Sequence, residues 1–264
     1  MPVRPATWAD LKPAARIAAL AFWEDEFLGE ALHPHRAKHP KSFQRSFLHD
    51  LYENFLDART RIMVSYPDDQ PDRITGMAVW SRMGDGGKHM EASQSWLHWL
   101  MSRCIIPIYI TIDAFVRPNR AADSAAWRDM ENSDAAVEEY LEKPDYKESW
   151  GLELLFQAPQ YQGRGFGKDL VAWGLARAKQ EGVRVSVASA PGKEGFYRKL
   201  GIDEEVEETP ENGQKNPFLG SLLFSKKFDK VVTTRGELLL VPNNETASET
   251  GKIEDHPFYL HHDS

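Results

Sequence analysis

The sequence is poor in cysteine and carries no excess of positive charge. Cys104 is the only cysteine, so the chain cannot form an internal disulfide, and nothing suggests an oxidising compartment. Lys and Arg number 32 against 40 Asp and Glu, which gives a formal net charge of −8. Broad nucleic-acid binding needs clustered basic residues that neutralise phosphates. We therefore expect no nucleic-acid partner.

Long apolar runs are also scarce. The most apolar run, 104–116, is shorter than the roughly 20 residues that span a bilayer, and Pro107 and Asp113 interrupt it. The first residues contain no charged segment followed by an apolar stretch, so we expect no secretory signal. These absences favour a soluble, cytoplasmic protein with no membrane partner.

Apolar residues make up 41% of the chain and aromatic residues 11%, which is enough for a sizeable core. Hydrophobic periodicity predicts a mixed sheet in one α/β (α+β) domain, in the order β-α-α-β-β-(insertion)-β-α-β-α-β-β. The domain covers 1–228, and a C-terminal extension, 229–264, is expected to be partly disordered from about 243 onward. The expected strands are 3–6, 61–65, 75–80, 150–157, 183–189 and 218–226, and the expected helices are 7–22, 40–58, 168–180 and 192–200.

The region 82–149 has a looser pattern and is interpreted as an insertion, with a short helix around 96–100. The acidic run 203–208 is interpreted as a solvated surface segment without a site.

A glycine-rich loop, 162–168, lies between a predicted strand and a predicted helix. Free N–H groups at the helix start and the positive end of its dipole attract an anion, and glycines let a pyrophosphate approach the backbone. Arg164 and Lys168 add positive charge. The loop therefore predicts a phosphate-binding site, with a ligand-free turn as the alternative.

The glycine spacing disfavours two common nucleotide sites. In a P-loop, four residues separate the first glycine from a Gly-Lys pair, and Ser or Thr follows the lysine. Here only three residues separate Gly163 from Gly167, and Asp169 follows Lys168. A dinucleotide fingerprint belongs soon after the first strand, whereas these glycines alternate late in the chain. A protein that binds ATP or NAD through this loop is thus a disfavoured third class.

The loop resembles that of the GNAT acetyltransferases, in which Gln or Arg precedes two spaced glycines. Gln162, Gly165 and Gly167 fill those positions. The stretch 188–202 resembles the second motif of the family, and the opening residues resemble its first strand and helix. The resemblance covers most of 1–228 and implies a single GNAT-like domain.

The resemblance implies acetyl-CoA as cosubstrate, with its pantetheine arm between the strands 150–157 and 183–189. The implied cofactor-binding residues are Leu155, Phe156, Gln157, Gln162, Gly163, Arg164, Gly165, Phe166, Gly167, Lys168 and Ser189. A backbone N–H near Phe156 is expected to polarise the thioester carbonyl.

Two catalytic residues are expected on the same basis. Tyr197 occupies the position at which the family commonly places a tyrosine that protonates the leaving thiolate. Glu153 is the only acid in the strand beside the cofactor and is the preferred general base, with Asp113 and Glu91 as rivals. No metal is expected, because the histidines near the C-terminus lack a ligand pattern.

The resemblance implies an N-acetyltransferase that transfers acetyl directly to a small-molecule primary amine in a ternary complex. The insertion 82–149 falls where the family often builds its substrate pocket. The alternatives are a peptide or protein amine as acceptor, or a non-catalytic acyl-CoA sensor. The quaternary state is expected to be a monomer or a homodimer.

Overall fold

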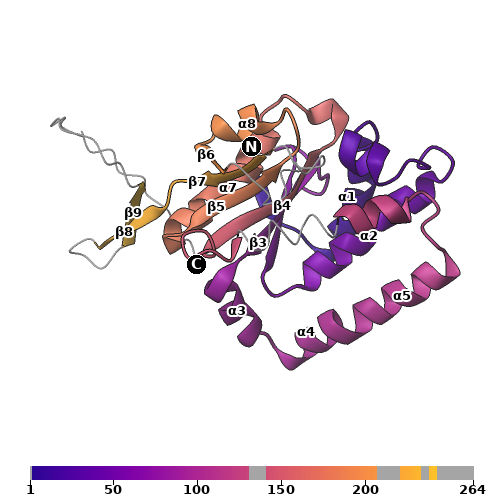
Figure 1. Ribbon diagram of the computed structural model, residues 1–264, viewed down its shortest axis with the longest axis horizontal. Coiled ribbons are helices and arrows are strands. Elements are labelled where there is room, and N and C mark those ends of the chain that lie inside the picture. Colours follow the sequence, from indigo (N-terminus) through magenta and orange to yellow (C-terminus); the bar gives the residue numbers. More distant parts are fainter. Residues whose placement is uncertain (1, 131–140, 207–220, 233–237, 243–264) are drawn as a thin grey trace.

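The computed structural model describes residues 2–130, 141–206, 221–232 and 238–242 (Figure 1). Its centre is a seven-stranded sheet in the order β1-β2-β3-β4-β5-β7-β6, beside a two-stranded sheet, β8-β9. All neighbours in the large sheet are antiparallel except β4 and β5, which are parallel. The strands are β1 (Val3–Pro5), β2 (Thr60–Ser65), β3 (Gly76–Arg82), β4 (Ser149–Gln157), β5 (Arg184–Ser189), β6 (Ile202–Val206), β7 (Ser221–Ser225), β8 (Phe228–Val232) and β9 (Leu238–Pro242).

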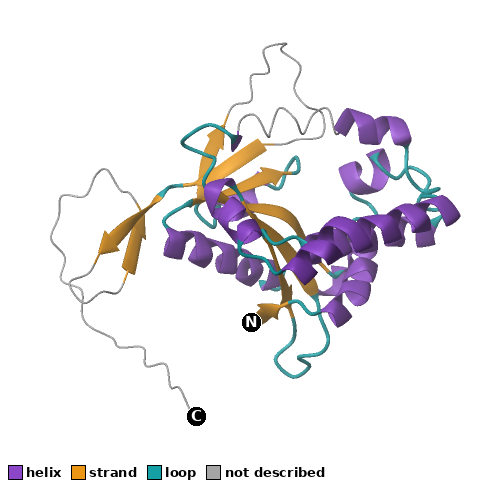
Figure 2. Ribbon diagram, turned by 90° about the horizontal axis from the view of Figure 1, so that it is seen from below, coloured by secondary structure: helices purple, strands orange, loops and turns teal. Residues whose placement is uncertain are grey.

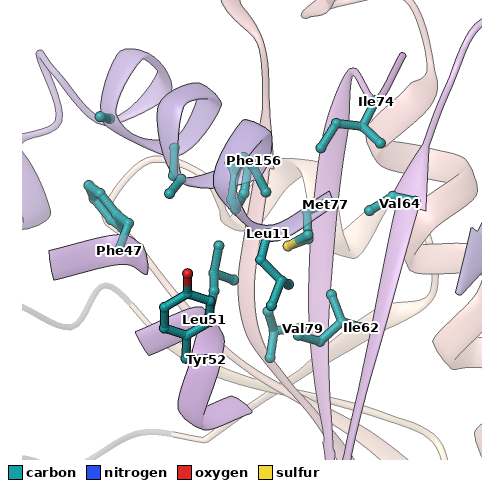
Figure 3. Close-up of a cluster of buried hydrophobic side chains, with 14 of the residues drawn as sticks. Leu11, Phe47, Leu51, Tyr52, Ile62, Val64, Ile74, Met77, Val79 and Phe156 are labelled. Carbon is teal, nitrogen blue, oxygen red and sulfur yellow. The ribbon is translucent and has the colours of Figure 1, made fainter. Parts of the chain in front are cut away.

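Helices cover both faces of the large sheet (Figure 2). On one face α1 (Trp8–Ala21) and α2 (Pro40–Leu56) bury a core against β2, β3 and β4, in which Leu11, Leu51 and Phe156 are almost fully buried (Figure 3). On the other face α7 (Phe166–Glu181) packs on β3, β4 and β5. Gly174 permits this contact, because a Cβ there would lie 2.3 Å from the ring of Trp80.

Smaller helical elements connect these layers. They are η1 (Glu26–Ala31), α3 (Gly84–Ala92), α4 (Trp96–Leu100), η2 (Met101–Ile105), α5 (Ile106–Val116), η3 (Pro159–Tyr161) and α8 (Glu194–Arg198). Both η1 and η2 are π-helical, and η3 is a 3₁₀ turn.

The N-terminal strand is tied to α1 by a capping box. The Asp10 carboxylate accepts hydrogen bonds from the backbone N–H of Thr7 at 2.7 Å and from the Arg4 guanidinium at 2.7 Å. Burial alone raises the pKa of Asp10, but the bonds from Arg4 and Thr7 outweigh it and hold that pKa below its usual value. The cap fixes where α1 starts and how the chain leaves β1.

A β-bulge in β4 inverts the usual alternation of its side chains. Trp80 on β3 lies opposite Leu152, and its neighbour Val79 lies opposite Leu154, so Glu153 is the extra residue. Leu152 therefore packs with the α7 core, whereas Leu154 packs against the α1–α2 core. The bulge thus divides β4 into two halves, and corresponding side chains in the two halves point to opposite faces of the sheet.

The strands β4 and β5 pair only at their beginnings. Their parallel register runs from Ser149 opposite Arg184 to Leu152 opposite Val187. Beyond that point β4 continues to Gln157 along β3, and β5 continues to Ser189 along β7. The two strands separate next to the bulge.

The structure confirms the mixed α/β architecture and corrects some of its predicted details. The acidic run is not only a surface segment, since β6 (Ile202–Val206) pairs with β7. Ile202 is fully buried, while Arg184 and Arg198 bind Glu204 and Glu205. The last predicted strand is shorter than expected in its described part, β7, and the tail from 243 lies outside the described residues.

The insertion is more helical than its sequence pattern indicates. The elements α4, η2 and α5 together make one helix, Trp96–Val116, of 21 residues, and it is long and apolar enough to cross a membrane by length and composition. The helix is longer than the apolar run 104–116, because it begins in the segment 96–103, where polar residues interrupt the apolar pattern. Pro107 lies at the start of α5 and Asp113 is buried, so neither residue ends the helix. One helix of this kind is weak evidence for a membrane span.

Candidate active site

A cleft of about 920 Å³ lies where β4 runs into the glycine loop and α7. Its lining comes from the end of β4, the glycine loop, the segment that follows α1 and the residues after β5. Its lining includes nine of the eleven predicted cofactor residues: Leu155, Phe156, Gln157, Gln162, Gly163, Gly165, Phe166, Gly167 and Lys168.

The loop is held open by two glycines with left-handed backbone. Gly163 has φ 72° and Gly165, the N-cap of α7, has φ 91°. A Cβ at either position would meet no atom within 4 Å, so the loop borders open space. The Gln162 amide closes the loop by donating to the Gln157 carbonyl at 3.3 Å. An open loop at the start of a helix fits a pyrophosphate group.

The two other predicted cofactor residues do not line this cleft. The Arg164 guanidinium lies 5.6 Å from the ring centroid of Tyr161, and Ser189 is buried and donates to the Ala190 carbonyl at 3.1 Å. Any contact of these two side chains with a cofactor stays a prediction.

A second cleft of about 590 Å³ lies along the first half of β4. It is lined by Gly151, Leu152 and Glu153, by residues of β5, and by the insertion through Met83, Glu91, Arg103 and Leu141. A Cβ on Gly151 would lie 3.0 Å from the Glu153 carboxylate, so that carboxylate lies over Gly151. A smaller neighbouring cleft of about 300 Å³ shares Asp57, Glu91 and Arg103 with the second cleft.

The rivals of Glu153 are placed differently. Glu91 lines the second cleft, but it already accepts bonds from Arg59 at 2.5 Å and Arg103 at 2.8 Å. The bond from Arg59 is the main cause that lowers the pKa of Glu91, which makes it a weak base. Asp113 is buried against α2 and lines none of the three clefts described above.

Tyr197 lies on α8, next to the first cleft but not among its lining residues. Its neighbour Phe196 lines that cleft, and the two rings are in edge contact with centroids 5.1 Å apart. Tyr197 also packs against the α7 core, and burial raises the pKa of its phenol to about 12. The acid role of Tyr197 therefore stays a prediction.

The two clefts follow the same pair of strands. Along β4, residues 151–153 line the second cleft and residues 155–157 line the first. Along the chain of β5, residues 186–188 line the second cleft, and Ala190, just beyond the strand, lines the first. The change occurs where β4 and β5 separate, so the linings of the two clefts adjoin each other along β4.

Several lining residues were not predicted. Phe22, Asp25 and Phe27 follow α1 and line the first cleft, while Asp57 and Arg59 follow α2 and line the second. Asp25 caps η1 by accepting bonds from the backbone N–H groups of Phe27 and Leu28, and an Asp before a helix is a signal that the sequence offers. Among the described residues, no group of three or more His, Cys, Asp or Glu could hold a metal.

Comparison with known proteins agrees with this geometry. A family model described as Acetyltransferase (GNAT) domain matches residues 140–215, whereas no curated protein sequence matches the chain. A structure from Corynebacterium glutamicum, of a histone acetyltransferase HPA2 and related acetyltransferase, has a TM-score of 0.52 and 18% identity, covering 85% of this chain and 95% of its own. The Drosophila melanogaster polyamine N-acetyltransferase, which forms N-acetylagmatine, has a TM-score of 0.50 and 15% identity, covering 84% and 97%.

The separated parallel strands and the glycine loop at the start of α7 define an acyl-CoA-dependent transferase of the GNAT fold. Residues 140–215 match the GNAT acetyltransferase domain, the family that the sequence motifs resemble. It is thus an acyltransferase whose donor is acetyl-CoA.

Proposed function

We propose that this enzyme transfers acetyl from acetyl-CoA to a primary amine of a small molecule, with both substrates bound at once. The observation that carries the proposal is the pair of clefts that meet where β4 and β5 separate. A donor in the first cleft and an acceptor in the second would meet at that gap. Direct transfer then needs no covalent enzyme intermediate.

The first cleft suits the donor. The open loop and the N-terminus of α7 take the pyrophosphate, and Lys168 adds positive charge. Residues 155–157 offer backbone groups that β5 does not occupy. When bound, acetyl-CoA supplies the acetyl group as a thioester. A backbone N–H near Phe156 then polarises the carbonyl oxygen of that thioester.

The second cleft suits a small cationic acceptor. Its volume of about 590 Å³ lies within the usual range for small-molecule sites, roughly 300–1,000 Å³. Asp57, Glu91 and Glu153 line it together with Arg59 and Arg103, which both bind Glu91, so a net negative charge remains to attract an ammonium group. The bulge presents Glu153 at the gap between the clefts. There its carboxylate accepts the proton that the ammonium must lose, directly or through water.

The test is an assay of thiol release from acetyl-CoA with a panel of small primary amines and amine-bearing peptides. Agmatine belongs in the panel because the Drosophila protein of the same fold acetylates it. Thiol release that depends on small amines and saturates with them is the expected result. Faster thiol release with the peptides would show that the acceptor is a peptide or protein amine. Binding of acetyl-CoA without thiol release in the presence of any amine would favour an acyl-CoA sensor.

Glu153→Gln tests the base within the same assay. The amide keeps the size of the side chain but cannot take the proton, so kcat is expected to fall by about 10² to 10⁴-fold. Acetyl-CoA affinity, measured by calorimetry, should remain unchanged because residue 153 lines the other cleft. Glu142→Gln, an exposed residue of the insertion outside all three clefts, is the matched control. A kcat of Glu153→Gln equal to that of the control would remove Glu153 from the mechanism.

A further inference from the structure

The helix Trp96–Val116 turns an apolar surface to the outside of the molecule. Figure 1 shows α4 and α5 along one edge of the protein, with no described helix or strand beyond them. Only 11% of the most apolar window of this helix is buried. The large apolar side chains that it exposes, by 43% to 89%, are Trp96, Leu97, Trp99, Ile105, Ile108, Tyr109, Ile112, Phe115 and Val116.

The inner side of the helix is firmly docked, so the outward direction of this surface is fixed. Ile106 is buried, and Asp113 pairs with His49 at 3.1 Å and Arg45 at 3.3 Å, both on α2. Asp113 also binds Arg117 at the end of its own helix, and moving the helix away from Arg45 would be costly, because the buried carboxylate would lose part of its charge compensation. The apolar surface is therefore a stable feature of the fold.

The exposed residues at the end of η2 and along α5 follow the spacing of a helix–helix seam. Ile105, Ile108, Ile112 and Phe115 are separated by three, four and three positions, which is the spacing of the a and d positions in a heptad. Side chains at these positions pack between the side chains of a second helix. The pattern indicates a helical partner.

We propose that this surface, residues 96–116, joins two copies of the chain in a homodimer through the symmetric packing of this helix against its counterpart. The nine exposed side chains offer on the order of 100 Å² each. They sum to roughly 900 Å², or about 700 Å² without the two tryptophans of α4, and a stable interface needs about 800 Å² per partner.

The charges of the helix allow such symmetric pairing. Arg103 and Asp113 are its only Asp, Glu, Lys or Arg residues. Arg103 binds Glu91, and Asp113 is buried. A two-fold axis brings the same surface of both copies together, so like charges would oppose each other in a charged interface. The outward surface of this helix presents almost no charged side chains that could repel each other in this way.

A lipid surface fits less well. The net charge of −8 repels the anionic lipids that draw peripheral proteins to membranes. A span would also have to carry Asp113 away from its partners on α2.

Sedimentation velocity of the full chain tests the proposal. At about 10 µM the wild type is expected to sediment with twice the chain mass of 30.1 kDa. Ile108→Glu combined with Ile112→Glu places four carboxylates in the seam of a dimer and should give the monomer mass. Leu20→Glu, on α1 and 61% exposed, makes the same kind of change elsewhere and should stay dimeric. Unchanged far-UV circular dichroism shows that each variant is folded.

Three results would overturn the proposal. The first is a wild type that remains monomeric at about 100 µM. The second is a folded double variant that remains dimeric. The third is a monomeric wild type that floats with vesicles of phosphatidylcholine and phosphatidylserine. The last of these would assign the surface to a membrane. None of these measurements uses enzymatic activity, so the outcome is independent of the proposed acceptor.

Discussion

At the scale of single residues, Gly151 and Glu153 are coupled by the bulge in β4. The Glu153 carboxylate lies where a larger residue 151 would place its side chain, with 3.0 Å between the carboxylate and a Cβ on residue 151. Such a short approach forces the neighbour to move. Because Gly151 has no side chain, the Glu153 carboxylate has room to lie in the second cleft. A side chain at residue 151 would displace this carboxylate, which we propose as the general base.

Tyr197→Phe tests the proposed acid. Burial raises the pKa of Tyr197 to about 12, whereas an ordinary thiol has a pKa near 8.5. The phenol thus stabilises a thiolate by donating a hydrogen bond rather than by giving up its proton completely. We expect kcat to fall by about 10²-fold and acetyl-CoA affinity to stay nearly unchanged. Because the folded pKa is raised, the hydroxyl stays protonated up to about pH 12, and no basic limb of the pH–rate profile below pH 11 should come from it.

A packing role for Tyr197 predicts a different result. The ring contacts Phe196 and the α7 core, so a tyrosine that only fills space would lower the melting temperature when altered and leave kcat at its wild-type value. Tyr146→Phe, whose hydroxyl bonds Glu204 away from the clefts, is the matched control. The comparison requires conditions in which chemistry limits the rate.

At the scale of secondary-structure elements, the sequence predicted those elements that have strong local signals. The glycine loop and the helix after it were placed correctly because glycines, a preceding β-rich run and helical periodicity agree there. The bulge at Glu153 was not predictable, since it changes the face of each later residue in β4 without any local marker. The predicted order ended in two strands, but the position of β6 was not identified, because the acidic run hides the fact that Arg184 and Arg198 balance Glu204 and Glu205.

Replacing Gly165 separates charge from backbone conformation in the loop. Gly165 is the N-cap of α7, with φ 91°, and Asn tolerates left-handed backbone better than most residues. Gly165→Asp adds a negative charge beside the proposed pyrophosphate site, whereas Gly165→Asn adds a side chain of the same shape without charge. Calorimetry with acetyl-CoA should show about 10²-fold weaker binding for Asp than for Asn. Equal affinities of the two folded variants would show that no phosphate lies there.

At the scale of the whole molecule, the second cleft, to which we assign the acceptor, is assembled from segments that are far apart in the sequence. Asp57 follows α2, Glu91 ends α3, Arg103 lies in the π-helix η2, and Ser186 belongs to β5. Charged residues of these types are common on protein surfaces, so the sequence pointed only to Glu153 and, as a rival base, to Glu91 among the residues that line this cleft. The fold brings these residues together partly through Glu91, which binds Arg59 before β2 and Arg103 in η2.

The same helix borders the acceptor clefts and carries the proposed dimer surface, so dimerisation and acceptor binding should be linked. Arg103 and Pro107 line the clefts, while Ile108 and Ile112 face outward from the next turns. A partner copy packed on the outer side would restrict the helix that forms one wall of the acceptor site.

We expect Ile108→Glu with Ile112→Glu to raise the KM for the amine roughly fivefold, which corresponds to about 1 kcal/mol. The KM for acetyl-CoA should change less than about twofold, because the first cleft is formed by other elements. Steady-state kinetics on the variant and on the Leu20→Glu control provide the comparison. An equal rise in both KM values would indicate general loosening of the fold. A monomeric variant with neither value changed would show that the helix is held rigidly by Asp113 and α2 alone, and the link between assembly and acceptor binding would then be wrong.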